Sequence, residues 1–135
     1  MQRQIVAAIL LLVTVGSTTA LLRAQQPPAP PPLDPRVAVW DAGPQKIDVS
    51  RYPAAIKDKY KLFADMCGRC HPLGRAINTD FVLPDDWERY IKRMMRRAKG
   101  VIAPEEAAQV YEFLIFDSRV RKSDLYEQRM AAAAK

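Results

Sequence analysis

The chain has 135 residues, which allows one small domain with flanking segments. Hydrophobic residues make up 49% of the chain and the formal net charge is +6, which excludes a chain that is disordered throughout. Two of the basic residues, Arg3 and Arg23, fall in the first 24 residues, which we do not expect to belong to the folded domain.

Residues 1–24 have the layout of a secretory signal peptide. Arg3 gives a basic start, an apolar run covers residues 5–15, and small polar residues follow. The alternative is an uncleaved membrane anchor, because the apolar run can be extended over residues 5–22, which is just long enough to span a bilayer. Both interpretations predict that the rest of the chain is exported, to the periplasm or to the outer face of the cytoplasmic membrane.

A proline-rich linker is predicted over residues 25–35. Six of these eleven residues are proline, which prevents a regular helix and favours an extended polyproline II conformation. Such a segment acts as a semi-rigid spacer. A spacer is most useful when the chain before it is fixed, which favours the membrane anchor, although a disordered N-terminus of a cleaved protein is equally compatible.

Residues 36–50 are predicted to form an extended segment on the surface of the domain. Val37 and Val39 alternate with polar or small neighbours, and Ala-Gly-Pro at residues 42–44 indicates a turn. We expect Trp40 to anchor this segment by packing against the domain.

Three amphipathic helices are predicted in the domain itself, residues 51–120, so the expected fold class is all-α. Each predicted helix begins at a proline, which is tolerated in a first helical turn, and apolar residues recur three or four positions apart in each. A capping box from Asp85 and Glu88 should begin the second helix, and Gly100 should end it. Residues 121–135 form a helix-prone tail that is poor in core residues. The three predicted helices cover residues 53–70, 84–100 and 104–122.

A domain of about 70 residues has a hydrophobic core that is only marginally sufficient for stability, and domains of this size usually need an additional cross-link or bound group. The chain has two cysteines, and they are three positions apart. A disulfide between them could not connect distant parts of the fold. We therefore expect another group to complete the core.

The sequence C-G-R-C-H places Cys67, Cys70 and His71 together, and C-x-x-C-H is the signature of covalent haem attachment. The two thiols add to the two vinyl groups of the porphyrin, and the adjacent imidazole becomes an axial ligand of the iron. A redox-active dithiol would need a preceding strand in an α/β chain, which is not predicted. A structural zinc site needs four ligands, and the chain has one histidine and no second C-x-x-C. The motif therefore predicts one haem c, which would fill the missing core.

Around this motif the chain resembles the short class I c-type cytochromes, over roughly residues 52–117. The stretch KLFADMCGRCH is similar to the family pattern of Leu-Phe, three residues and then C-x-x-C-H. The resemblance implies about three helices packed around one covalently bound haem. It also implies that Phe63 faces the C-terminal helix, at Val110, Phe113 and Leu114.

The chain departs from the family pattern at two places. The family often carries glycine four residues before the phenylalanine, where the helices cross, and this chain has Lys59. A loop proline whose carbonyl orients the ligating imidazole has no clear equivalent, and Pro72, which directly follows His71, is a poor substitute.

The sixth ligand of the iron is expected to be a methionine. His71 is the only histidine, which excludes bis-histidine ligation within one chain, and a thioether is a common partner in electron-transfer cytochromes. Met94 and Met95 are the candidates, since the other methionines are expected in the signal, on the attachment helix and in the tail: Met1, Met66 and Met130. The stretch WERYIKRM is similar to a pattern in cytochrome subunits of periplasmic dehydrogenases, which implies Met94. Met95, an open sixth site and ordinary core methionines remain alternatives.

Two further residues are candidates for haem contacts. Arg75, four residues after the ligating histidine, is expected either to pair with a haem propionate or to be solvated. Trp87 is expected to pack against the haem or in the core rather than to contact a partner.

The predicted function is one-electron transfer by a monohaem cytochrome, which is not an enzyme, acting as a free carrier or as a fixed subunit of a larger oxidoreductase or photosynthetic complex. The alternative is a five-coordinate haem protein with a sensing or catalytic role. The expected partners are redox proteins, with membrane association through residues 5–22 if these are retained. The basic residues between Arg89 and Lys99 either steer an acidic partner or form a solvated helix face. Nucleic acid is not an expected partner of an exported haem protein.

Overall fold

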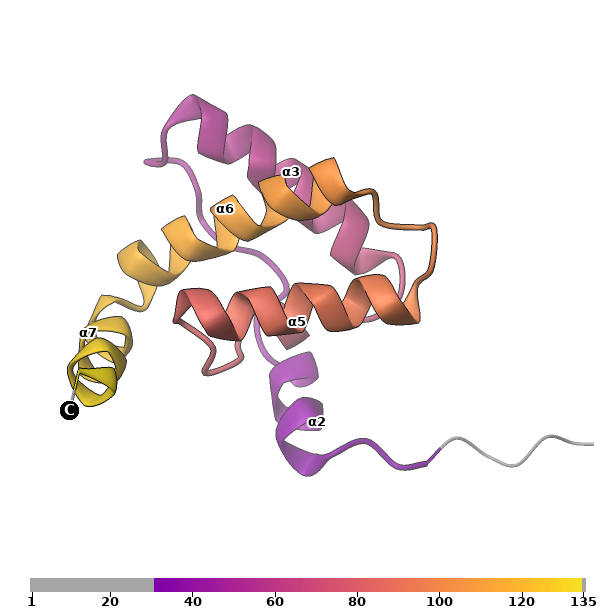
Figure 1. Cartoon of the computed structure of the whole chain (residues 1–135), viewed down its shortest axis with the longest axis horizontal. Coiled ribbons are helices and arrows are strands. Elements are labelled where there is room, and N and C mark those ends of the chain that lie inside the picture. The colour runs from indigo at the N-terminus through magenta and orange to yellow at the C-terminus, as the bar shows by residue number, and fades with distance from the viewer. Residues whose placement is uncertain (1–30, 135) are drawn as a thin grey trace, which may run out of the picture. The chain divides into compact units, whose positions relative to one another are not determined.

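A computed structural model describes residues 31–134 of the chain, and it is all-helical over this range (Figure 1). This confirms the all-α class. The predicted signal or anchor and most of the proline-rich linker lie outside the described residues. None of the helices within residues 31–134 is both long and apolar enough to cross a membrane. The helices are α2 (Pro35–Ala42), α3 (Ala54–Gly68), α4 (Gly74–Ile77), α5 (Pro84–Arg97), α6 (Pro104–Arg121) and α7 (Ser123–Ala133).

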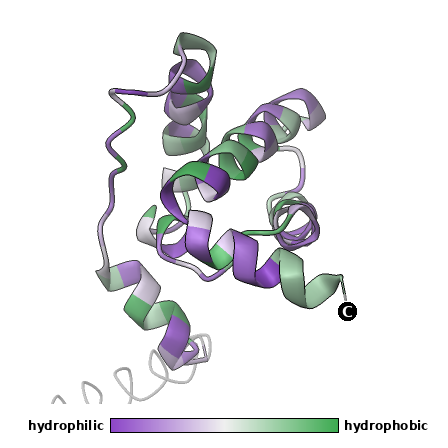
Figure 2. Ribbon diagram, turned by 90° about the vertical axis from the view of Figure 1, so that its left-hand side faces the viewer, coloured by the Kyte–Doolittle hydropathy of each residue, from purple (hydrophilic) through white to green (hydrophobic). Residues whose placement is uncertain are grey.

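Helix α2 corrects the prediction of an extended segment over residues 36–50, which is wrong for the first half of that range. Asp34 begins the helix, because its carboxylate accepts the N–H of Arg36 at 2.8 Å, and proline occupies the first helical position. Hydrophobic and hydrophilic residues are mixed around this short helix (Figure 2), so its sequence has no clear helical period. Val39, for example, is 71% exposed. The predicted turn at residues 42–44 marks the end of the helix.

Helices α3, α5 and α6 correspond to the three predicted helices, and their ends show which side chains cap them. The predicted capping box of Asp85 and Glu88 is wrong, because it is Asp86 whose carboxylate accepts the N–H of Leu83, at 3.3 Å. Helix α5 ends at Arg97, and Gly100 lies beyond it with a φ of 76°, a conformation that favours glycine. Helix α3 ends at Gly68, two residues earlier than expected.

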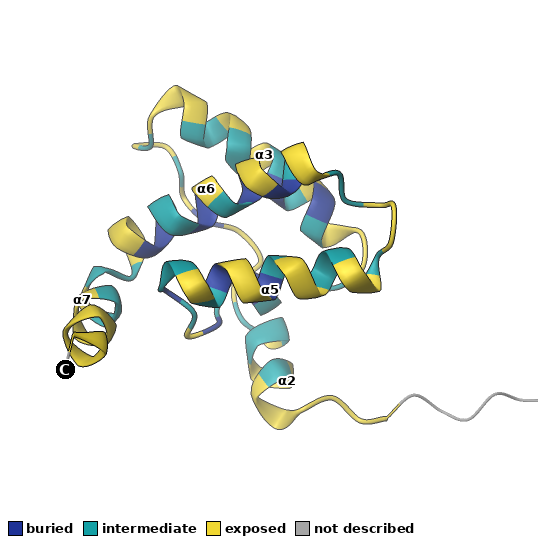
Figure 3. Cartoon of the chain, in the orientation of Figure 1, coloured by how far each residue is buried: buried dark blue, intermediate teal, exposed yellow. Residues whose placement is uncertain are grey.

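The centre of the fold is the contact between α3 and α6. Phe63 and Phe113 are both fully buried, with ring centroids 5.1 Å apart, and Tyr60 packs on Phe113 at 5.4 Å. Figure 3 shows the buried residues of α6 along the side that faces α3 and α5. Lys59, where the resembled family often carries glycine, is accommodated by an ion pair with Glu112 of α6. The contact that the resemblance implied between Phe63 and Phe113 is therefore present.

Helix α5 is attached to α6 through Trp87, which is 1% exposed. Its Nε1–H donates a hydrogen bond to the hydroxyl of Ser118 at 2.9 Å. The Nζ atom of Lys122 lies 5.7 Å from the centroid of the tryptophan ring, within the range of a cation–π contact. The ring also meets Phe81 and Tyr90 edge-on, each at 5.9 Å between centroids.

A buried carboxylate organises the C-terminal end of α6. Asp117 is 2% exposed and accepts hydrogen bonds from the guanidinium of Arg121 and from the hydroxyl of Tyr52, the latter at 3.0 Å. Arg121 also donates to the backbone carbonyl of Ile77 at 3.0 Å. The loop before α3, the last residue of α4 and helix α6 are thus joined by one polar network. Helix α7, which corresponds to the predicted tail, contains no buried residue.

Replacing Ser118 with alanine should lower the free energy of unfolding by about 1–3 kcal/mol, because the buried indole N–H of Trp87 loses its acceptor. Urea denaturation followed by circular dichroism would measure this. Ser123→Ala is the matched control, since the hydroxyl of Ser123 makes only an exposed contact, and should change stability by less than about 0.5 kcal/mol. Equal effects of the two substitutions would contradict the role of Ser118.

Candidate functional site

The C-x-x-C-H motif lies where the chain leaves α3. Cys67 is in the last turn of the helix and partly buried, four residues after Phe63 and on the same side. Cys70 is exposed and His71 is half-buried, both beyond the end of the helix. Both cysteines are free thiols. The motif therefore offers one inward-facing thiol and a second thiol and an imidazole at the surface.

A small apolar cavity brings Cys67 and Met94 together. It has a volume of about 30 Å³, and its walls come from the ends of α3 and α5, from α6 and from the loop before α6. Leu114 and Val110 of α6 contribute to the walls. Burial, and to a smaller extent the neighbouring Cys70, raises the pKa of the Cys67 thiol to about 12, so this thiol is protonated at neutral pH.

Met95 does not line this cavity. It lies in a separate surface depression of about 250 Å³ between α5 and the first turns of α6, with Pro104 and Tyr111. Ile91 is common to both sites. Of the two candidate methionines, Met94 is thus the one that shares a cavity with a cysteine of the motif.

Tyr90 also lines the cavity, and its hydroxyl is buried without a hydrogen-bond partner among the described residues. A buried hydroxyl that makes no hydrogen bond costs roughly 1–3 kcal/mol, and such groups are rare in folded proteins. Burial, followed by the nearby Cys67, raises the pKa of Tyr90 above its usual value, so the group stays a neutral donor. The sequence analysis missed Tyr90, whose only signal was its position three residues after Trp87 on the same helix face.

The imidazole of His71 has its own backbone contact, since its Nδ1 atom lies 3.0 Å from the carbonyl oxygen of Pro72. In the tautomer with the proton on Nδ1, the ring donates to this carbonyl and Nε2 is free to act as a ligand. Pro72 was expected to be a poor substitute for the proline carbonyl of the resembled family. In the structure the carbonyl of Pro72 is nevertheless the one that lies within hydrogen-bond distance of the ring.

Arg75 has a protein partner that the sequence analysis did not foresee. Its Nε donates to a carboxylate oxygen of Asp41 in α2 at 2.9 Å, and its Nη2 pairs with the other oxygen. Both side chains are mostly buried, at 23% and 14% exposed. The guanidinium of Arg75 holds the pKa of Asp41 below its ordinary value. Asp41 was missed because α2 itself was not predicted.

Further contacts fasten α2 to α4, the short helix that follows His71. The side-chain oxygen of Gln45 accepts the N–H of Gly74 at 2.8 Å, and the amide of Asn78 donates to the carbonyl of Trp40 at 2.8 Å. A Cβ atom on Gly74 would lie 2.5 Å from that same carbonyl oxygen, so the contact requires glycine. We refer to this set of contacts, together with Asp41 and Arg75, as the α2–α4 clasp.

The residues of this region fit a covalently attached haem. Two free thiols and an imidazole have the C-x-x-C-H spacing, and a thioether shares an apolar cavity with one of the thiols. A buried hydroxyl in that cavity has no partner in the described part of the chain. The cavity holds about one water molecule, so the apolar side chains around it must move apart to admit a porphyrin. Trp87 lies in the core between α5 and α6, outside the cavity lining. Within residues 31–134 there is no cluster of three or more His, Cys, Asp or Glu side chains that could hold a metal ion.

Replacing Asp41 with asparagine should lower the free energy of unfolding at pH 7 by about 1–2 kcal/mol, because a charge-assisted hydrogen bond to Arg75 is lost. The pKa of Asp41 is lower in the folded than in the unfolded protein, so the pair stabilises the fold at neutral pH. This contribution is lost as the pH falls below 3.8, the ordinary pKa, toward the folded-state value. Urea denaturation should therefore show a difference between wild type and variant that shrinks at low pH.

The control for this experiment is Asp58→Asn, which removes the exposed ion pair with Lys61 and should change stability by less than about 0.5 kcal/mol at any pH. A difference between wild type and Asp41→Asn that does not depend on pH would show that the charge of Asp41 does not contribute.

The comparisons with known proteins give no match for this chain. No protein-family model matches it, no curated protein matches it, and no solved structure matches it.

Proposed function

We propose that the protein is a monohaem c-type cytochrome that carries single electrons outside the cytoplasmic membrane. The haem is attached through Cys67 and Cys70, and the iron is ligated by His71 and Met94. The observation that carries the proposal is the apolar cavity that Cys67 and Met94 line together, directly before the turn that holds His71.

The residues around this cavity have distinct roles in the proposal. Cys67 and Cys70 supply the sulfur atoms that fix the group to the end of α3. The carbonyl of Pro72 orients the His71 ring so that Nε2 is available. The apolar walls, including Leu114 of α6, exclude water. The bound haem supplies reversible one-electron chemistry at its iron, and a thioether ligand raises the potential of such a group.

Electron transfer is favoured over catalysis by the proposed ligand set. With His71 and Met94 both bound, the iron has no free position for a substrate. Cys70 is exposed and His71 is partly exposed, which supports an attachment site with one edge at the protein surface, where electrons could pass to and from other proteins. The protein therefore needs a docking surface rather than a substrate pocket.

The basic residues of α5 support a redox partner with an acidic surface. Two of the cations of this helix, Arg89 and Lys92, are paired with carboxylates of the same helix. The other three, and Lys99 just beyond the end of the helix, are exposed and form no ion pair with any residue in the range 31–134. The three on the helix lie next to Met94 in the sequence: Arg93, Arg96 and Arg97. Unpaired charges of one sign raise the rate of association with a partner of opposite sign. The partner is a redox protein or membrane complex, and the protein acts as a free carrier or as a fixed subunit held by residues 5–22.

Covalent attachment predicts that haem stays with the polypeptide in acidified acetone or in a denaturing gel stained for haem peroxidase activity. In the variant Cys67→Ser/Cys70→Ser, any bound haem should be extracted completely. The matched control is Met66→Leu, which alters the neighbouring buried residue and leaves both thiols. Complete extraction of haem from the wild type, or a wild type without haem, would contradict the proposal.

Ligation by Met94 predicts that the ferric wild type shows the weak far-red absorption band of a methionine-ligated haem and that the ferrous form does not bind carbon monoxide. Met94→Ala should lose this band and bind carbon monoxide, because the sixth position opens. Met95→Ala should behave like the wild type, since Met95 lines a different site. An unchanged spectrum in Met94→Ala would disprove this ligand. Carbon monoxide binding by the wild type would instead favour a five-coordinate haem with a sensing or catalytic role.

A further inference from the structure

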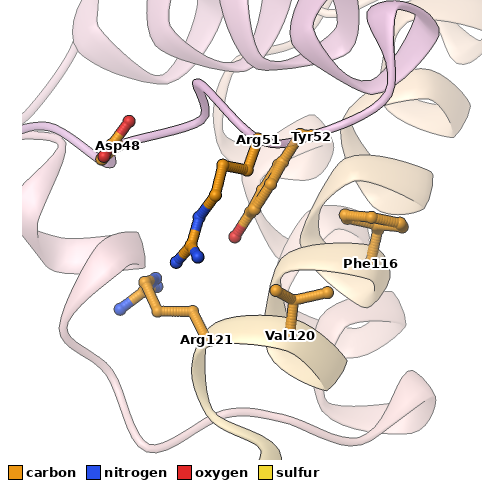
Figure 4. Close-up of a pocket in the computed structure, with 6 residues that line it drawn as sticks. All are labelled: Asp48, Arg51, Tyr52, Phe116, Val120 and Arg121. Carbon is orange, nitrogen blue, oxygen red and sulfur yellow. The ribbon is translucent and has the colours of Figure 1, made fainter.

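A second and larger cavity lies at the opposite end of α3 from the C-x-x-C-H motif (Figure 4). Its volume is about 630 Å³, which is within the range of roughly 300–1,000 Å³ typical of small-molecule sites. Tyr52, two residues before the first turn of α3, lines this cavity, whereas Cys67 is in the last turn. A helix of this length separates the two sites by about 20 Å. The lining residues are Asp48, Arg51, Tyr52, Phe116, Val120 and Arg121.

Two guanidinium groups point into the same space in this cavity. Both line the cavity, Arg51 from the loop before α3 and Arg121 from the end of α6 (Figure 4). Arg51 makes no ion pair or side-chain hydrogen bond with any residue in the part of the chain that the structure describes. A planar guanidinium is well suited to bind a carboxylate.

Arg121 is held rigidly in position by the network at the end of α6. Its Nε and Nη2 atoms donate to the buried carboxylate of Asp117 at 3.1 and 2.7 Å, and Nη2 also donates to the carbonyl of Ile77. Its Nη1 atom has no partner among the described residues and is available to a ligand. Because Arg121 is already ordered, a ligand does not have to pay the entropy of fixing it.

The remaining charged and polar groups determine which anion fits. Asp117 neutralises the charge of Arg121, and Asp48 lies at the rim, where its carboxylate accepts the N–H of Ser50 at 2.9 Å. Tyr52 donates to Asp117, and burial raises its pKa to about 12, so it adds no negative charge at neutral pH. The two guanidinium groups and two carboxylates give a formal charge of zero, and Arg51 is the one guanidinium that has no ion pair among the described residues. One such group suits a monoanion better than a phosphate dianion.

One side of the cavity is apolar. The ring of Tyr52 meets the ring of Phe116 edge-on, with centroids 5.0 Å apart, and Val120 is 51% exposed beside them. Figure 4 shows these side chains adjacent to the guanidinium groups. A ligand that contacts both parts of the cavity has a charged head and an apolar body.

We propose that this cavity binds a small amphipathic carboxylate. Its carboxylate group bonds to Arg51 and to Nη1 of Arg121, and its apolar part lies against Tyr52, Phe116 and Val120. This binding site is separate from the haem site and does not depend on the function proposed for it.

The test is calorimetric titration of the full chain, as isolated, with three probes: octanoate, acetate and octylamine. Octanoate should bind, acetate should bind at least about tenfold more weakly because it lacks the apolar contact, and octylamine should not bind because its charge is reversed. Arg51→Gln should weaken octanoate binding about tenfold or more, since it removes a charge-assisted hydrogen bond. Val120→Asp should abolish binding by placing a carboxylate in the cavity. Both substitutions change exposed side chains, so the fold, followed by circular dichroism, should be unchanged.

Matched controls come from exposed residues of the same types on α2, Arg36→Gln and Val39→Asp, which should bind octanoate as the wild type does. The proposal is overturned if the wild type does not bind octanoate or if Arg51→Gln binds it equally well. Equal affinities for octanoate, acetate and inorganic phosphate would also overturn it, because the site would then recognise any anion. None of these results depends on whether Met94 ligates the iron.

Discussion

The buried contact between Phe63 and Phe113 is the constraint on which the arrangement of the proposed site depends. It fixes α3 against α6, and Cys67 follows Phe63 by one helical turn, so the inward-facing thiol is placed against α6 as well. Helix α5 is attached to the same central helix through Trp87, and Met94 lies two turns further along α5. The two sides of the apolar cavity are thus positioned independently of each other, and each depends on α6. A core this small leaves few alternative ways to bring a thiol and a thioether together.

Local sequence signals predicted the elements that bury a continuous apolar face. The period of apolar residues identified α3, α5 and α6, and proline marked where each begins. Helix α2 was missed because its eight residues have no such face, and the alternation of Val37 and Val39 imitates a strand. It is stabilised by its cap at Asp34 and by contacts with α4, which lies more than 25 residues later in the chain. Contacts of that separation are not visible in a local pattern.

The residues of the candidate site also fall into two groups, those that a local sequence pattern predicts and those that it does not. Cys67, Cys70 and His71 could be found from their spacing, because the haem attachment proposed for them requires residues close together in the sequence. Tyr90 and Asp41 could not, because what distinguishes them is a relation to distant parts of the fold. For Tyr90 it is a buried hydroxyl with no hydrogen-bond partner among residues 31–134, and for Asp41 it is an ion pair across 34 positions of sequence. The choice of Met94 over Met95 as the candidate ligand likewise depends on which cavity each side chain lines.

The α2–α4 clasp has a mechanical consequence. Helix α2 is the first element after the proline-rich segment, so a pull on the backbone at Leu33 reaches the domain through α2. The α2–α4 clasp transmits that load to α4, which begins three residues after His71. The load reaches the core helices only after α4. Side-chain hydrogen bonds and a close glycine contact, rather than a broad apolar surface, carry the load. Tension at the N-terminal end of the domain is therefore coupled to the loop that orients the imidazole.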